Sequence, residues 1–369
     1  MPGPDPAFWR GRRVLVTGHT GFKGAWLVLW LRELGAAVTG FALDPPTDPS
    51  LYAAARVGEG IEDLRGDLED PGAVDRAFEA AHPEVVVHMA AQPLVRRSFQ
   101  DPLGTYETNV MGTVHLLEAL RAAPDARAAV VVTSDKCYEL RPDGAACRED
   151  DRLGGRDPYS SSKACAELVT AAYRRSFPGG AATATARAGN AIGGGDWAPD
   201  RVVPDAMRAG LAREELVVRN PDAVRPWQHV LSPLSGYLLL VERLWDDRSA
   251  AGAWNFGPDP SDELPVREVA DRTCELWVEG LRWTAAADGG PPETAVLRLD
   301  STKAREELGW GPAWQLDQAL GATVEWHRAV RDGADAREVC AAQIADYAAA
   351  LACRKRAEPA SHPSAIRPS

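Results

Sequence analysis

Several features that mark other protein classes are missing from this chain. Its six cysteines form no C-x-x-C pair and no His/Cys cluster with the spacing of metal ligands. No apolar run approaches the length of a membrane span, and the first residues lack the basic-then-apolar pattern of a signal peptide. The formal net charge of −12 argues against a nucleic-acid surface. We therefore expect a cytoplasmic protein with reduced thiols, no metal site, and no membrane or nucleic-acid partner.

A glycine-rich turn near the start is the first positive signal. The apolar run 13–17 leads into the turn 18–24, and a second apolar stretch, 25–31, is long enough to be a helix. Strand, glycine turn and helix together predict a dinucleotide pyrophosphate site at the helix N-terminus. The spacing G-x-x-G-x-x-G departs from the commonest fingerprint, and a purely structural turn is the alternative. The turn residues expected at the cofactor are Gly18, Gly21, Phe22, Lys23 and Gly24.

An acidic residue follows at the distance that such a site requires. Asp44 ends the next apolar run, 37–43, about twenty residues after the last glycine of the turn. A carboxylate here would hydrogen-bond the adenosine ribose of NAD and repel the 2′-phosphate of NADP. The sequence therefore favours NAD. The alternative is an aspartate that starts a turn before Pro45.

A second motif carries acid–base chemistry. Tyr159 and Lys163 are four residues apart, so on a helix they share one face. A tyrosine is a poor base at neutral pH, and a neighbouring ammonium is expected to lower its pKa. Ser134, Asp135 and Lys136 lie upstream and can supply a hydroxyl, an acid and a second base. A tyrosine and a lysine at this spacing also occur by chance on surface helices.

Alternating strand-like and helix-like stretches predict an α/β fold with a doubly wound parallel (Rossmann) sheet. The strand-like runs lie near 13–17, 37–43, 85–88, 128–133 and 181–188. We expect residues 1–188 to form an NAD-binding domain, with a return near 225–257. Residues 189–330 would form a smaller, interleaved mixed α/β substrate domain. Residues 331–369 would form a C-terminal helix and a disordered tail.

Five blocks, two of which contain the motifs above, resemble in their order the extended short-chain dehydrogenase/reductase family of nucleotide-sugar enzymes, and within it the CDP-glucose 4,6-dehydratases. The likeness runs to about Trp326. The blocks are Gly18–Gly24, Ala91–Arg96, Thr133–Tyr138, Gly193–Trp197 and Arg225–Val230. The resemblance implies further NAD contacts from Asp67, Leu68, Ala90, Ala91, Gln92 and Asn109, together with Tyr159 and Lys163.

The resemblance also implies a reaction: loss of water from CDP-glucose to give CDP-4-keto-6-deoxyglucose. Tyr159 would take the O4 proton with Ser134 beside it, and Lys163 would hold the nicotinamide ribose. Asp135 would act as the acid toward O6 and Lys136 as the base at C5. An alternative for Lys136 is that it only pairs with Asp135 and orients it.

Substrate contacts are expected from Gln92, Arg96, Asn190, Arg201 and Arg225. Arginine suits a diphosphate because its planar fork donates two parallel hydrogen bonds. The alternatives are a dehydratase or a C4 epimerase for another nucleotide sugar, and an inert NAD-binding protein. The pair Asp135–Lys136 argues against an epimerase. The resemblance implies a homodimer or a dimer of dimers, formed through the helices within 105–121 and 158–173.

Overall fold

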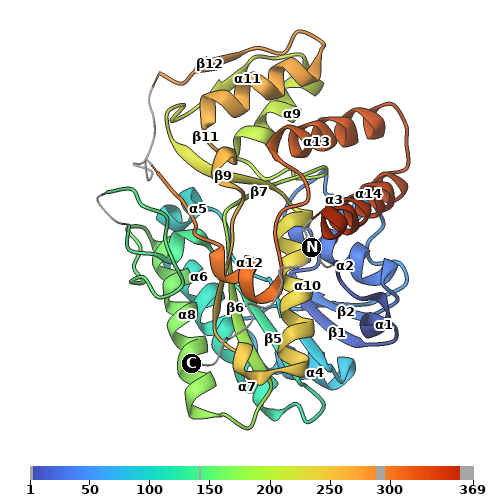
Figure 1. Cartoon of the computed structure of the whole chain (residues 1–369), viewed down its shortest axis with the longest axis vertical. Coiled ribbons are helices and arrows are strands. Elements are labelled where there is room, and N and C mark those ends of the chain that lie inside the picture. Colours follow the sequence, from blue (N-terminus) through green and yellow to red (C-terminus); the bar gives the residue numbers. More distant parts are fainter. Residues whose placement is uncertain (1–2, 141–142, 288–295, 358–369) are drawn as a thin grey trace, which may run out of the picture.

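The computed structural model describes residues 3–140, 143–287 and 296–357. Its centre is a seven-stranded, wholly parallel sheet in the order β10-β6-β5-β4-β1-β2-β3 (Figure 1). This confirms the predicted doubly wound α/β class. The strands are β1 (Arg13–Thr17), β2 (Ala37–Ala42), β3 (Glu62–Arg65), β4 (Val85–His88), β5 (Ala128–Val132), β6 (Ala182–Ala188) and β10 (Ala253–Phe256).

Helices cover both faces of this sheet because successive strand residues point to opposite sides. In β1, Val14 and Val16 pack in one apolar core with α2 and α10, while Leu15 packs in another with α4 and α7. Strands buried on both faces need continuous apolar runs, which is why the central strands were readable from the sequence. The covering helices are α2 (Phe22–Glu33), α4 (Pro71–Ala81), α7 (Gly112–Ala122), α8 (Pro158–Ser176) and α10 (Leu231–Asp246).

Apart from the two apolar cores on the faces of the large sheet, a separate apolar core, called the second core below, lies among smaller elements. It is built from Met207, Trp227 and Trp277 with other residues of two small sheets and three helices. The small sheets have the orders β11-β9-β7 and β12-β8. The elements are β7 (Asn190–Ile192), β8 (Leu216–Val218), β9 (Val224–His229), β11 (Glu263–Pro265), β12 (Trp283–Ala285), α9 (Val202–Ala212), α11 (Val266–Trp277) and α13 (Leu316–Arg331).

The chain passes between the large sheet and the second core more than once. After β9 it returns to the large sheet with α10, and β10 then pairs with β6 at the sheet edge. The division into domains at 188/189 stays a prediction.

Shorter elements and the C-terminal helix complete the fold. Tyr347 of the C-terminal helix meets Trp30 of α2 edge to face. The predicted tail from 358 onward lies outside the described residues. No helix in the described part is long and apolar enough to span a membrane. These elements are α1 (Pro6–Trp9), α3 (Leu51–Ala54), α5 (Val95–Gln100), α6 (Pro102–Tyr106), α12 (Thr302–Leu308), α14 (Ala336–Ala357), the π-helical turn η1 (Glu107–Met111), and the 3₁₀ turns η2 (Asp135–Cys137), η3 (Arg248–Ala250) and η4 (Pro260–Asp262).

One half-buried carboxyl joins the N-terminal segment to α10. Oε1 of Glu242 accepts from Asp5 N at 2.8 Å and from Trp9 Nε1 at 2.6 Å. Burial raises the pKa of Glu242 to about 7, and the negative charges of Asp5 and Asp246 add to this. The folded protein therefore binds this proton more tightly than the unfolded chain does, and stability falls as pH rises from 4.5 to about 7.

We predict that Glu242→Gln raises the thermal midpoint at pH 8 by about 1–3 °C and changes it little at pH 4.5. Glutamine keeps the accepting oxygen and removes the buried charge. Scanning calorimetry at the two pH values measures this, with the exposed Glu33→Gln as control. An equal shift at both pH values would contradict the assignment.

Candidate functional site

The glycine turn brings the start of α2 against the end of β1. Gly18 has φ +76°, and a Cβ on it would lie 2.7 Å from Ala90 N. A Cβ on Gly24 would lie 2.1 Å from Gly18 O, so neither position can carry a side chain. The N-cap of α2 is Gly21, which has no side chain to satisfy the first N–H groups of the helix. These groups remain available to an anion, as a dinucleotide pyrophosphate requires.

This turn opens into a pocket of about 930 Å³ at the carboxyl ends of the strands. It lies where β1 and β4 are neighbours and the strand order reverses, the usual ligand crevice of a doubly wound sheet. Every site residue expected from the sequence lines it except Asn109. The lining residues among them are Gly18, Gly21, Phe22, Lys23, Gly24, Asp44, Asp67, Leu68, Ala90, Ala91, Gln92, Arg96, Ser134, Asp135, Lys136, Tyr159, Lys163, Asn190, Arg201 and Arg225.

Asn109 lies behind the pocket wall, in the π-helical turn η1. Its Oδ1 accepts from Gln92 N at 2.8 Å, and its Nδ2 donates to Gln92 O at 3.1 Å and to Ser162 Oγ at 2.8 Å. The side chain is 2% exposed. Asn109 therefore holds the loop after β4 against α8, and its effect on a ligand passes through Gln92.

At one end of the pocket Asp44 stands at the tip of β2. Its side chain is 92% exposed, and Oδ1 lies 3.2 Å from Arg65 Nε. Arg65 also pairs with Asp63, which in turn accepts from the fully buried His19 at 2.7 Å. The sequence pointed to Asp44 and gave no sign of this supporting cluster. The open carboxylate and the glycine turn fit the ribose and the pyrophosphate of a dinucleotide.

The other end of the pocket holds the Ser134–Asp135–Lys136 run. Ser134 Oγ donates to Asp135 Oδ1 at 3.0 Å and accepts from Lys136 N at 3.2 Å. Asp135 Oδ2 is buried and has no hydrogen-bond partner among the described atoms. Burial raises the pKa of Asp135, and the cations of Lys136, Arg225 and Lys23 act in the opposite direction. A protonated carboxyl with one free oxygen is suited to donate to a leaving hydroxyl.

Tyr159 and Lys163 enter the same end from α8. The helix is held by its N-cap Asp157, whose carboxylate accepts from Ser160 N at 2.9 Å, and Pro158 occupies the first position. Burial raises the pKa of Tyr159 to about 12, while a hydrogen bond with Ser134 lowers it. Lys163 Nζ donates to Val132 O at 3.2 Å. The expectation that Lys163 lowers the pKa of Tyr159 below its ordinary value is therefore wrong in this structure, because burial has the largest effect and Arg201, not Lys163, is the cation that lowers this pKa.

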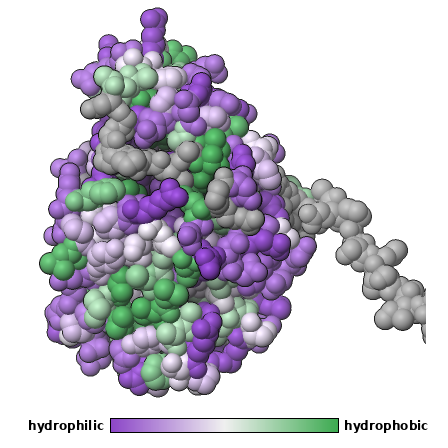
Figure 2. Space-filling view, turned by 90° about the vertical axis from the view of Figure 1, so that its left-hand side faces the viewer, coloured by the Kyte–Doolittle hydropathy of each residue, from purple (hydrophilic) through white to green (hydrophobic). Residues whose placement is uncertain are grey.

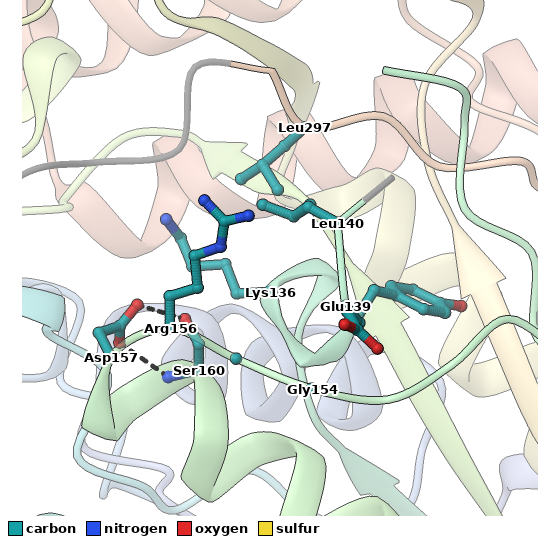
Figure 3. Close-up of a pocket in the computed structure, with 10 residues that line it drawn as sticks. Lys136, Glu139, Leu140, Gly154, Arg156, Asp157, Ser160 and Leu297 are labelled. Carbon is teal, nitrogen blue, oxygen red and sulfur yellow. Dashed lines mark hydrogen bonds between the residues drawn. The ribbon is translucent and has the colours of Figure 1, made fainter. Parts of the chain in front are cut away.

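Lys136 stands between the large pocket and a smaller one of about 360 Å³. Figure 3 shows Lys136 and Arg156 extending into the small pocket, with Leu140 and Leu297 beside them. Within the described residues, no carboxylate lies at ion-pair distance from the Lys136 ammonium. The charge of Lys136 nevertheless lowers the pKa of Asp135, so both the base and the orienting role of Lys136 stay predictions.

Of the expected substrate arginines, Arg201 and Arg225 line the pocket from the side of the second core, and Arg96 lines it from α5. Arg225, at the start of β9, is 4% exposed, and its Nη1 donates to Val224 O at 2.9 Å. Arg201 pairs with Asp196 at 3.0 Å, and Arg96 lies 3.5 Å from Asp200. Asn190 begins β7 beside them. Three guanidinium groups at one wall suit an anionic ligand.

Sequence reasoning missed the buried support beneath the site. Glu167 accepts from Thr185 Oγ1 and from Arg187 Nη2, both at 2.7 Å, and Arg187 Nη1 donates to Tyr138 Oη at 2.7 Å. Glu167 lies four residues beyond Lys163, so its place on the same helix face was a readable signal. Tyr237 of α10, which accepts from Lys23, gave no such signal because the two are far apart in sequence.

Comparison with known proteins shows which family this chain resembles. The family model described as GDP-mannose 4,6 dehydratase matches residues 15–249. The chain is 46% identical to the CDP-glucose 4,6-dehydratase of Salmonella typhimurium over 94% of this chain and 99% of that protein. It is 31% identical to a dTDP-glucose 4,6-dehydratase of Streptomyces griseus over 85% of this chain and 93% of that one.

Solved structures agree in fold. The NAD complex of UDP-glucose 4-epimerase from Thermus thermophilus has a TM-score of 0.75 at 26% identity, covering 86% of this chain and 99% of that one. The dTDP-glucose 4,6-dehydratase DesIV of Streptomyces venezuelae, solved with NAD, has a TM-score of 0.72 at 26% identity, covering 87% and 98%. The glycine turn, the tyrosine–lysine helix and these likenesses agree: the chain belongs to the nucleotide-sugar 4,6-dehydratases of the extended short-chain dehydrogenase/reductase family.

Proposed function

We propose that this chain is a CDP-glucose 4,6-dehydratase that uses NAD to convert CDP-glucose to CDP-4-keto-6-deoxyglucose with loss of water. The observation that carries the proposal is the meeting of Ser134, Asp135 and Lys136 with Tyr159 and Lys163 in the pocket that the glycine turn opens. The 46% identity to the Salmonella typhimurium enzyme supports the choice of CDP-glucose. NAD, when bound, supplies a hydride acceptor and donor, so that one sugar carbon is oxidised and another reduced.

Two groups would act at the sugar O4. Tyr159 would take the O4 proton as its phenolate, and Ser134, hydrogen-bonded to it, would hold O4 in line. Lys163, whose pKa burial lowers to about 8, would bind ribose hydroxyls and offset the negative charge on the phenolate. Loss of the O4 proton and the C4 hydride leaves a 4-keto group, which acidifies the hydrogen at C5.

Elimination would use the neighbouring pair. Burial raises the pKa of Asp135, and its Oδ2 is free, so its protonated form would donate a proton to the departing C6 hydroxyl. Lys136 would remove the C5 proton as the neutral amine, because only that form has a lone pair to accept it, and no carboxylate in the described part of the chain holds the ammonium form in an ion pair. A C4 epimerase has no need for such a pair, because no water is lost.

The second core would supply the nucleotide site. Arg225, with support from Arg201 and Arg96, would clamp the diphosphate, and Asn190 and Gln92 would contact the sugar side. Residues 189–330 would thus act as the substrate-binding unit.

The first experiment incubates the purified protein and NAD with CDP-, dTDP-, UDP- and GDP-glucose in turn. We expect one product, lighter than CDP-glucose by one water, detected by mass and by the alkali-induced absorbance of the 4-keto sugar. Turnover of a different nucleotide sugar would keep the mechanism and discard the CDP assignment. A C4 epimer of unchanged mass would contradict the roles of Asp135 and Lys136.

We predict that Lys136→Met lowers turnover at least about 100-fold and leaves NAD binding unchanged. Oxidation at C4 does not need Lys136, so enzyme-bound NADH should accumulate and persist at 340 nm when CDP-glucose is added. In Tyr159→Phe this absorbance should not appear, because the O4 proton has no acceptor. Unimpaired turnover in Lys136→Met would remove the base assignment.

We also propose a homodimer formed through α6, η1 and α8. Leu103 of α6 is 68% exposed, Met111 of η1 47% and Leu168 of α8 59%. Tyr106 Oη donates to Ser161 Oγ at 3.1 Å and ties the two helices together. Figure 2, which looks onto this side of the molecule, shows hydrophobic surface gathered low on the face. Exposed apolar patches of this kind mark association surfaces.

The double variant Leu103→Glu/Leu168→Glu is predicted to be monomeric in size-exclusion chromatography with light scattering, whereas the wild type is dimeric. Facing carboxylates cannot be buried without partners. The control is Val278→Glu, a 71% exposed apolar residue at the end of α11. A wild-type monomer, or a dimer that the double variant leaves intact, would exclude this interface.

A further inference from the structure

Asp200 is a carboxylate in the pocket wall that pairs with two arginines from different parts of the fold. Its Oδ1 lies 2.9 Å from Arg219 Nη1 and 3.5 Å from Arg96 Nη1. Arg219 follows β8 of the second core, whereas Arg96 belongs to α5, which packs against α8. All three residues line the large pocket. One carboxylate oxygen therefore joins the second core to the side of the pocket that carries α5 and α8.

The backbone around Asp200 holds this carboxylate in place. Asp200 has φ +64°, in the left-handed region that residues other than glycine, asparagine and aspartate seldom adopt. Before it in the chain, Asp196 accepts from Ala198 N and from Arg201 Nη1, both at 3.0 Å. Directly after it, Arg201 is the N-cap of α9. The carboxylate is thus presented to the two arginines by a loop that is fixed on both sides.

The two arginines differ in the partners that they would keep without Asp200. Nη2 of Arg219 also lies 3.5 Å from Asp205 Oδ2, so this cation would retain a second carboxylate. Arg96 has no other ion pair among the described residues. The side chains of Arg96, Asp200 and Arg219 are 31%, 35% and 27% exposed, so a ligand can reach them. Ion pairs of this exposure are weak, and a stronger anion can replace the carboxylate.

The arrangement at Asp200 is that of an anion site occupied by a protein group. Two guanidinium groups converge on a single oxygen, as they do on an oxygen of a phosphate. A diphosphate carries more negative charge and more acceptor oxygens than a carboxylate, so it would compete for the same donors. While Asp200 holds Arg96 and Arg219, these two cations cannot give their full charge to a ligand.

We propose that Asp200 is a positioning residue for nucleotide binding: it holds Arg96 and Arg219 in the empty pocket, and the diphosphate of the incoming nucleotide displaces it. This inference rests on the proposed function, because it takes the bound anion to be the diphosphate of CDP-glucose. The carboxylate lowers the affinity of the pocket for every ligand that carries the diphosphate, and the product is one of these. The enzyme thereby binds its substrate less tightly and releases its product faster.

The test measures the dissociation constants of CDP and of cytidine by calorimetry on the NAD-loaded protein. Asp200→Asn keeps the shape of the side chain and removes its charge, so we expect it to tighten CDP about tenfold. The affinity for cytidine, which has no phosphate, should stay unchanged. The gain for CDP should shrink as salt is raised, because salt screens half-exposed charges. In turnover assays the KM for CDP-glucose should fall, and kcat should not rise because product release is slower.

A double variant tests whether Asp200 acts through Arg96. In an Arg96→Gln background, Asp200→Asn should tighten CDP about threefold or less, since only Arg219 is then released. The matched control is Asp335→Asn. Asp335 also pairs with an arginine, Arg56 at 2.7 Å, and its side chain is 32% exposed, but it does not line the pocket. Its replacement should leave both dissociation constants unchanged. If Asp200→Asn does not fold, Asp200→Gly removes the same charge at a φ that glycine adopts freely.

Four results would overturn the inference. Weaker binding of CDP to Asp200→Asn would mean that the carboxylate orients the arginines toward the ligand and does not compete with it. Equal tightening of CDP and cytidine would place the effect at the nucleoside. Unchanged affinities would remove Asp200 from the binding step. An undiminished gain in the Arg96→Gln background would show that Asp200 does not act through Arg96.

The wild-type protein separates this inference from the proposed function. A protein that binds CDP, shows the expected change in Asp200→Asn and does not dehydrate CDP-glucose would overturn the proposed reaction and leave the role of Asp200 standing. A wild type that does not bind CDP would overturn both.

Discussion

The buried ion pair between Glu167 and Arg187 is the interaction on which the rest of the site depends. Arg187 lies in β6, Glu167 in α8, and the Tyr138 hydroxyl that Arg187 donates to follows η2 directly. Tyr138 in turn donates to Asn255 of β10 at 2.7 Å. Removing one partner would leave a buried charge without compensation, at a cost of about 3–5 kcal/mol. This one pair thus connects β6, the turn η2 and the helix α8. The turn carries Asp135 and Lys136, and the helix carries Tyr159.

Above this pair the pocket combines burial with an excess of positive charge. Burial raises the pKa of Asp135 and of Tyr159 and lowers the pKa of Lys163 and Lys23, so each group is moved toward its neutral form. When the pKa values of acids are raised and those of bases are lowered in this way, a small change in the surrounding charge is enough to move a proton onto or off each group. An anionic substrate supplies negative charge that compensates the positive charge of the arginines and lysines. The electrostatics of the pocket are therefore completed by its ligands.

The sequence correctly predicted those features that depend on local patterns of residues. Continuous apolar runs located the central strands, the glycines marked a turn in which no Cβ fits, and all but one of the expected site residues line one pocket. Strand β3 was missed because an edge strand reading Glu-Asp-Leu-Arg has no apolar run. The pKa of Tyr159 was predicted in the wrong direction, because a spacing shows a neighbouring charge and does not show the depth of burial. Tyr237 meets Lys23 only through the packing of α10 against α2, which no local signal reports.

The path of the chain between the large sheet and the second core has a consequence for how such enzymes diversify. The polypeptide leaves the large sheet after β6, comes back with α10 and β10 and leaves again with β11. It returns with α12 beside β10, leaves with α13, and returns with α14 against α2. Neither part is encoded by one uninterrupted stretch of the gene. Recombination at a single breakpoint cannot move the second core onto another scaffold as a cassette. Within this architecture, changes of specificity are accessible to substitutions and loop changes made in place, while the elements that carry Ser134 and Tyr159 keep their positions.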